Sequence, residues 1–121
     1  MSRIRVAVSG AAGRMGRAAV RTVARENDML LVAALGRERG VGRDAGELAG
    51  AAPLGVTVSS DPAQVFAASP DVWVEFAPGS PAAAHARAAL EQGISPVVGS
   101  TGIAAEEIER LGALAASRRI G

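Results

Sequence analysis

Short apolar runs alternate along the chain with longer stretches in which apolar residues recur at helical spacing. The apolar runs are rich in valine, leucine, isoleucine and alanine, and each has the length of a single strand. They predict five strands, at residues 4–9, 29–35, 55–59, 72–76 and 95–99. The run MLLVAAL at 29–35 is apolar at nearly every position, so we expect it to be buried on both faces, as strands of parallel sheets are.

Helices are predicted between these strands and after the last of them. They cover 14–26, a short stretch after Asp61-Pro62, 81–92 and 104–117. Asp61 is expected to be the N-cap of the second helix, with Pro62 at its first helical position. Gly93 follows the third helix at a position that favours a left-handed backbone. The glycine-rich segment 37–53 has no clear period and is predicted to be a long loop, of a kind that often carries function.

The alternation of strands and helices indicates an α/β fold, a Rossmann-type doubly wound parallel sheet. The 121 residues have the length of one compact domain, so we expect a single domain over 1–121. Residues 118–121 have the pattern of a sixth strand that is cut short.

Composition narrows the chemistry that the chain offers. All thirteen basic residues are arginine, cysteine and tyrosine are absent, and His85 is the single histidine. Acid and base catalysis is thereby restricted to carboxylates and one imidazole, and disulfides and thiolate sites are excluded. No apolar run reaches the roughly 18 residues of a membrane span, and a net charge of +1 indicates no nucleic-acid partner. We expect a cytoplasmic protein with no membrane partner and no metal.

The segment VSGAAGRMGR, residues 8–17, places three glycines between the first strand and the first helix. In a dinucleotide-binding turn, Gly10 would allow a sharp turn, Gly13 would let the backbone approach the pyrophosphate, and Gly16 would let helix and strand pack closely. The anion then lies on unpaired N–H groups at the positive end of the helix dipole. Because the glycines directly follow a strand and precede a helix, we predict an NAD(P)-binding domain rather than an ordinary turn.

The end of the second predicted strand bears on which cofactor binds. NAD-binding domains commonly carry an acid there, about twenty residues after the turn, that bonds the adenosine ribose. This chain has Gly36, followed by Arg37, Glu38 and Arg39. A glycine leaves room for a 2′-phosphate and an arginine can bond it, so we predict that NADPH binds at least as well as NADH, with Arg37 as the contact. Glu38 could instead turn toward the ribose.

Three motifs taken together are more specific than the glycine triplet. They are GAAGRMGR at 10–17, GRDAGELAG at 42–50 and PVVGSTG at 96–102. In these motifs the chain resembles the amino-terminal domain of 4-hydroxy-tetrahydrodipicolinate reductase, also called dihydrodipicolinate reductase. The resemblance implies NADH- or NADPH-dependent reduction of a cyclic precursor of diaminopimelate and lysine. The implied cofactor contacts are Gly10, Ala11, Ala12, Gly13, Arg14, Met15, Gly16, Gly36, Arg37, Phe76, Ala77, Gly99, Ser100 and Thr101, and Thr101 would also lie close to the substrate.

The chain departs from the family pattern at several positions. Gly36 stands where many members have an acid, Ser100 replaces a threonine, and Ala77 lacks the hydroxyl that usually follows Phe76. Family members also continue into a second domain, with a His-His-x-x-x-Lys type motif, a Gly-Thr pair for the substrate, and the sheet that forms a homotetramer. None of this is found within 1–121, so we predict a chain that binds cofactor, has no catalytic residue of its own and does not turn over alone.

The remaining titratable residues are expected to have structural roles. His85 is predicted to be a surface or half-buried helix residue, Glu75 and Asp71 to bond N–H groups of nearby loops, and the arginines at 14, 17, 21 and 25 to form a solvated helix face. Two other functions stay open. A stand-alone NAD(P)-binding regulatory module would recruit a partner to the face that a second domain otherwise covers. Another Rossmann-type family, such as an amino-acid dehydrogenase, fits the glycine turn but not the DAGELAG loop.

Overall fold

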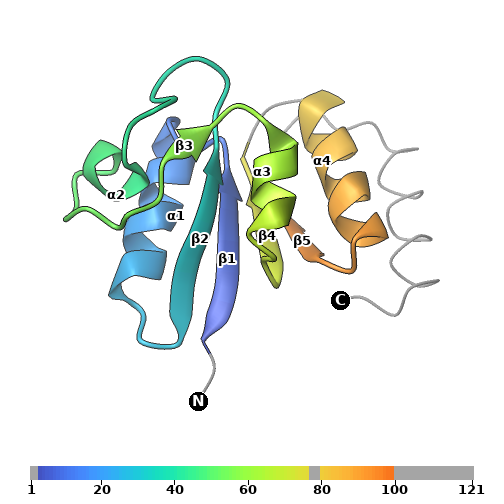
Figure 1. The fold of residues 1–121 in the computed structure, drawn as a ribbon, viewed down its shortest axis with the longest axis horizontal. Coiled ribbons are helices and arrows are strands. Elements are labelled where there is room, and N and C mark those ends of the chain that lie inside the picture. Colours follow the sequence, from blue (N-terminus) through green and yellow to red (C-terminus); the bar gives the residue numbers. More distant parts are fainter. Residues whose placement is uncertain (1–2, 77–79, 100–121) are drawn as a thin grey trace.

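The computed structural model describes residues 3–76 and 80–99. This part of the chain forms a five-stranded sheet in which all paired strands run parallel, in the order β3-β2-β1-β4-β5 (Figure 1). The strands are β1 Ile4–Ser9, β2 Met29–Leu35, β3 Val58–Ser59, β4 Val72–Glu75 and β5 Ser95–Val98. The helices are α1 Arg14–Arg25, α2 Ala45–Leu48, α3 Pro62–Ala67 and α4 Ser80–Glu91. The predicted α/β fold with a doubly wound parallel sheet is confirmed.

Helices cover both faces of the sheet. Because successive strand residues point to opposite faces, β1 contributes Val6 and Val8 to a core shared with α1 and α2, and Ala7 to a second core shared with α3 and α4. Strand β2 also contributes to both cores, as expected, although Leu30 near its start remains 38% exposed. The two cores hold the central strands rigidly, so the residues that follow the strand ends have a fixed frame.

Local signals explain where several helices begin and end. Asp61 caps α3 by accepting the N–H of Ala63 at 3.0 Å, and Pro62 opens the helix, as predicted. Gly93, after α4, has a left-handed φ of 78°, also as predicted. Among the described helices, none combines the length and apolar character that a membrane span requires.

Two predictions about the segment before α3 were wrong. Segment 37–53 is not a loop throughout, because it contains α2, whose N-cap Asp44 accepts the N–H of Glu47 at 3.1 Å. The strand predicted at 55–59 is reduced to β3, because Gly55 has a left-handed φ of 74° and Thr57 pairs antiparallel with Asp44. The predicted helix at 104–117 and the strand-like residues 118–121 lie outside the described residues.

Candidate functional site

The candidate site lies at the carboxyl edge of the sheet, where the strand order reverses beside β1. Ligands of open α/β sheets bind in the crevice outside the strand ends at such a reversal. Four of the predicted site residues stand one position after a strand, and the parallel pairing brings them to this one edge. They are Gly10 after β1, Gly36 after β2, Phe76 after β4 and Gly99 after β5.

Two of the three glycines in the first turn are required by the fold itself. Gly10 has a left-handed φ of 77°, and its N–H, like that of Ala11, donates to the carbonyl oxygen of Leu35, at 2.9 and 3.1 Å. A Cβ on Gly16 would overlap the carbonyl group of Gly10, so only glycine lets α1 pack this closely on the turn. Both glycines therefore have the roles that the sequence predicted.

Gly13 is not required by any contact of this kind. Its φ is −79°, and an added Cβ would meet nothing nearer than the carbonyl oxygen of Gly10, at 3.4 Å. Gly13 is the N-cap of α1 and has no side chain to accept a hydrogen bond, and the first turn contains no acid. The first helical bond runs from the N–H of Arg17 to the carbonyl of Gly13 at 2.9 Å, so the N–H groups of the first turn have no partner within the helix. This helix start is open to an external anion.

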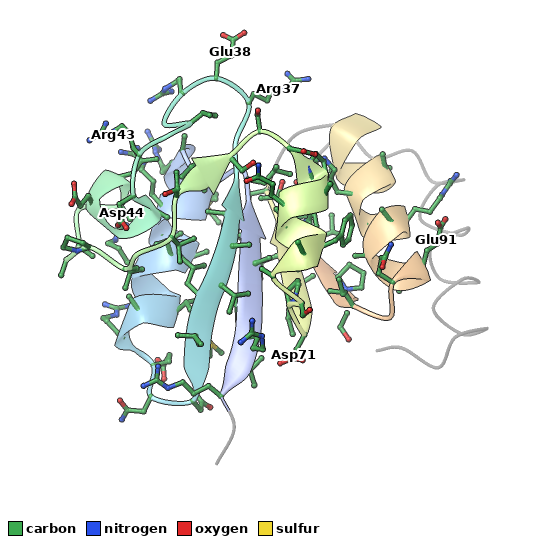
Figure 2. All side chains as sticks on the ribbon, viewed as in Figure 1. Arg37, Glu38, Arg43, Asp44, Asp71 and Glu91 are labelled. Atoms are coloured by element: carbon green, nitrogen blue, oxygen red, sulfur yellow. The ribbon has the colours of Figure 1, made fainter. Side chains whose placement is uncertain are left out.

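The loop after β2 lies beside the glycine turn. A Cβ on Gly40 would lie 3.4 Å from the Cβ of Ala12, which places the two segments in contact. Arg37, Glu38 and Arg39 are exposed, and Figure 2 shows the side chains of Arg37 and Glu38 extending outward from the tip of this loop. Gly36 has a structural reason of its own, because a Cβ there would lie 3.0 Å from Cγ1 of Val58.

Asp44, where this loop ends, caps α2 and holds residues 54–56, a role that sequence reasoning missed. Its Oδ1 accepts the N–H groups of Glu47 and Leu54, at 3.1 and 3.0 Å, and its Oδ2 accepts those of Gly55 and Val56, at 2.8 and 3.2 Å. The Leu54 N–H contributes most to holding the pKa of Asp44 below its ordinary value, and all the N–H donors together outweigh the opposing effect of burial. The spacing Asp44-x-x-Glu47 is a helix-start signal that would have revealed the cap. The DAGELAG motif is thus a loop anchor behind the site.

Phe76 and Gly99 follow β4 and β5 and lie on the other side of β1 at this edge of the sheet. The N–H of Phe76 donates to the carbonyl of Ser9 at 3.0 Å, which ties it to the end of β1. A Cβ on Gly99 would lie 2.5 Å from Cε1 of Phe76, so glycine permits the close packing of these two residues. The predicted contacts Ala77, Ser100 and Thr101 lie outside the described residues.

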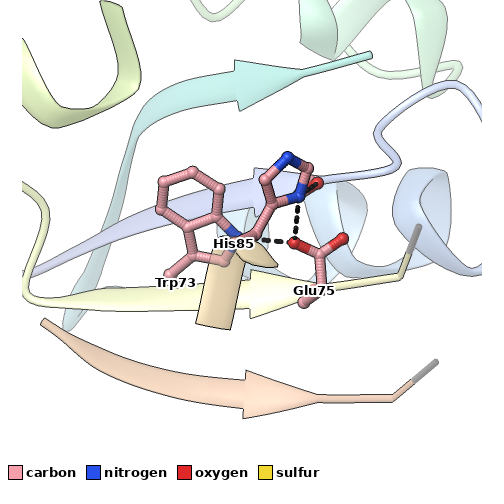
Figure 3. Close-up of polar contacts among 4 residues, drawn as sticks. Trp73, Glu75 and His85 are labelled. Carbon is pink, nitrogen blue, oxygen red and sulfur yellow. Dashed lines mark hydrogen bonds and ion pairs between the residues drawn. The ribbon is translucent and has the colours of Figure 1, made fainter. Parts of the chain in front are cut away.

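The two carboxylates at either end of β4 differ in what they bind. Asp71, at the opposite edge of the sheet, accepts the backbone N–H of Arg5 at 2.9 Å. Glu75, which was expected to bond loop N–H groups, is fully buried and accepts hydrogen bonds from the side chains of Trp73 and His85 (Figure 3). His85 is half-buried, as predicted, but its pairing with Glu75 was not foreseen.

Comparison with known proteins identifies the family to which the chain belongs. Residues 4–121 match the family model described as dihydrodipicolinate reductase, N-terminus. The chain is 47% identical over 119 residues to 4-hydroxy-tetrahydrodipicolinate reductase of Moorella thermoacetica. The matched region covers 98% of this chain and 44% of that protein. The chain thus spans less than half the length of this curated relative.

Two solved structures show the same fold. The dipicolinate-bound dihydrodipicolinate reductase from Paenisporosarcina sp. TG-14 has a TM-score of 0.80 and 29% identity, covering 98% of this chain and 45% of that chain. GenD2 from gentamicin A biosynthesis, solved with NAD, has a TM-score of 0.81 at 21% identity, covering 99% of this chain and 33% of that chain, and indicates the fold alone. The chain belongs to the dihydrodipicolinate reductase family and corresponds to the amino-terminal part of its members.

Proposed function

We propose that the chain is the dinucleotide-binding part of a 4-hydroxy-tetrahydrodipicolinate reductase and holds NADPH or NADH at the carboxyl edge of its sheet. One observation carries the proposal: α1 begins without a side-chain cap at Gly13, where no contact within the described fold demands a glycine. Unpaired N–H groups at a helix start are suited to bind the phosphates of a dinucleotide.

The proposed contacts divide into three regions of the crevice. The pyrophosphate is assigned to the turn at 10–16, where the helix dipole contributes about 0.3 to 1 kcal/mol and directed N–H bonds supply the rest. The adenosine half is assigned to the loop after β2, at Gly36 and Arg37, and the nicotinamide half to Phe76 and Gly99. The family resemblance adds Ala77, Ser100 and Thr101 on the nicotinamide side, with Thr101 next to the substrate.

Within this arrangement the chain's own residues bind and orient, and the bound cofactor supplies the hydride. The ends of β1 and β4 lie side by side at this edge, and the loop after β2 ends at Asp44, whose side chain holds residues 54–56. Holding a reactant in a fixed pose is a large part of catalysis, since hydride transfer needs the two carbons about 3 to 3.5 Å apart.

Arg37 is proposed to favour NADPH over NADH. It is exposed at the loop tip, Gly36 beside it has no side chain to occupy the space of a 2′-phosphate, and a charge-assisted bond contributes about 1.5 to 3 kcal/mol. Replacing Arg37→Ala should therefore weaken NADPH binding about tenfold and leave NADH binding nearly unchanged. Fluorescence titration with both cofactors measures this, and Arg25→Ala, at the far end of α1, is the matched control. A strong preference for NADH together with unchanged NADPH affinity in Arg37→Ala would reject this assignment in favour of Glu38 bonding the ribose.

We expect the 121 residues to bind cofactor without appreciable turnover. The relative from Moorella thermoacetica is more than twice as long, and we propose that the remainder of such a chain supplies the substrate-binding surface and the contacts of a homotetramer. Mixing the chain with NADPH and 4-hydroxy-tetrahydrodipicolinate should leave NADPH absorbance constant. A steady loss of absorbance above the protein-free background would contradict this expectation.

A further inference from the structure

A polar cluster lies at the carboxyl ends of β1 and β4 and is not among the proposed cofactor contacts. Oε1 of Glu75, the last residue of β4, accepts from Nε1 of Trp73 at 2.9 Å and from Nδ1 of His85 at 2.8 Å (Figure 3). Oγ of Ser9, the last residue of β1, lies 3.4 Å from the same ring nitrogen. The cluster thus joins the ends of the two strands that flank the crevice to helix α4.

The imidazole of His85 is the bridge in this cluster. A carboxylate as fully buried as that of Glu75 is costly unless it is hydrogen-bonded and paired. Because the acceptor is a carboxylate oxygen, Nδ1 of His85 carries the proton and donates it. The His85 side chain is 19% exposed, so the bridge reaches from the interior to the surface of α4.

The cluster acts on the residues that follow it in the chain. Gly10 directly follows Ser9, and Phe76 directly follows Glu75 and is tied back to the carbonyl of Ser9 at 3.0 Å. Phe76 is the described residue on the nicotinamide side of the crevice that packs against Gly99. By contrast, the adenosine side is held by Asp44, which belongs to a separate set of hydrogen bonds.

We propose that Glu75 and His85 are positioning residues that set Phe76 for the nicotinamide half of the bound dinucleotide, independently of the adenosine half. This inference rests on the proposed function. It gives His85, the single histidine of the chain, a positioning role that differs from acid catalysis and from surface charge.

The test compares NADPH with 2′,5′-ADP, which contains only the adenosine half. In His85→Leu, NADPH should bind about tenfold more weakly, while 2′,5′-ADP affinity changes by less than about twofold. Since His85→Leu leaves the carboxylate without its histidine donor and can destabilise the fold, the double variant Glu75→Gln/His85→Leu removes the buried charge and should show the same split. His85→Asn retains an N–H donor and should restore NADPH binding. Ala84→Asn, at an exposed position of α4, controls for helix propensity.

Trp73 provides a fluorescence signal that should change only if the Glu75–His85 pair positions the nicotinamide. It is the single tryptophan, it is fully buried, and its ring lies 5.5 Å from that of His85. Energy transfer from Trp73 to the bound reduced nicotinamide should fall in both leucine variants at saturating NADPH. If the variants bind both ligands more weakly to the same extent, or bind neither more weakly, this inference is wrong while the proposed function still stands. Failure of the unmodified chain to bind either ligand would overturn the proposed function and this inference with it.

Discussion

Helices α1 and α3 begin in opposite ways. At α3, Asp61 accepts the N–H of Ala63 at 3.0 Å, whereas at α1 the N-cap is Gly13 and no side chain accepts. A side-chain cap stabilises a helix by about 1 kcal/mol relative to alanine and by a few tenths of a kcal/mol relative to glycine, and a Cβ at position 13 would meet only ordinary contact distances. Among the described helix starts with assigned caps, α1 alone lacks this stabilisation, and it lies at the edge where four strand ends converge. The comparison shows one helix start capped by the fold and one left uncapped, and the uncapped start is the one that we propose binds a ligand.

The largest effect on stability and binding should come from adding a side chain at Gly16, where α1 packs against the glycine turn. In Gly16→Ala the new methyl group overlaps the carbonyl of Gly10, so turn and helix must separate. We expect a loss of about 3 kcal/mol in the free energy of unfolding, together with loss of dinucleotide binding. Urea denaturation measures the first and fluorescence titration the second. A variant as stable as the unmodified chain would show that close packing is not the reason for this glycine.

Asp44 tests whether a cap that also anchors a loop matters more than a simple cap. An asparagine keeps one acceptor atom, so Asp44→Asn should leave two of the four N–H groups without an acceptor. Because folding lowers the pKa of Asp44, its contribution to stability is present above the ordinary pKa and is lost as the pH falls through the lowered one.

Thermal melting between pH 7 and pH 2 measures both consequences. Asp44→Asn should melt lower at pH 7 than the unmodified chain, and the gap should narrow in acid, below about pH 4. A gap that stays constant through this range would show that the charge of Asp44 does not contribute.

Asp61 tests the cap of α3 alone. Asp61→Ala should cost about 1 kcal/mol, because one N–H at the helix start loses its acceptor. Cofactor affinity should not change, since α3 follows the edge strand β3 and contains none of the proposed cofactor contacts. Paired denaturation and NADPH titration check this, and a large loss of affinity would mean that the two helix starts are coupled.

Much of the frame could be predicted from the sequence because single strands and caps leave local signals. The apolar runs at 4–9 and 29–35 coincide with β1 and β2, and Asp61-Pro62 marks the start of α3. Helix α2 was missed because four residues are too few to show a helical period. Strand β3 was predicted too long, because the bridge that takes Thr57 out of the sheet depends on a partner far along the chain.

The site could be predicted only where a single segment builds it. The glycine turn follows from its place between strand and helix, but sequence alone does not show that Gly13, unlike Gly16, has no packing reason. The pairing of Glu75 with His85 was missed, because it depends on how α4 lies against β4. Contacts between side chains of different helices and strands depend on how these elements pack. Local sequence patterns do not show this packing.

The most direct test of the central claim is to give α1 the cap that it lacks. In Gly13→Asp the carboxylate would accept an N–H of the first turn, so stability should rise by a few tenths of a kcal/mol. The same carboxylate would occupy the anion position and repel phosphate, so NADPH should bind about a hundredfold more weakly. Gly13→Asn, a neutral cap of the same shape, separates charge from occupancy. Titration of the Gly13→Asp variant with NADPH is the decisive measurement. We predict a variant that melts no lower than the unmodified chain but scarcely binds NADPH. An affinity equal to that of the unmodified chain would contradict the account.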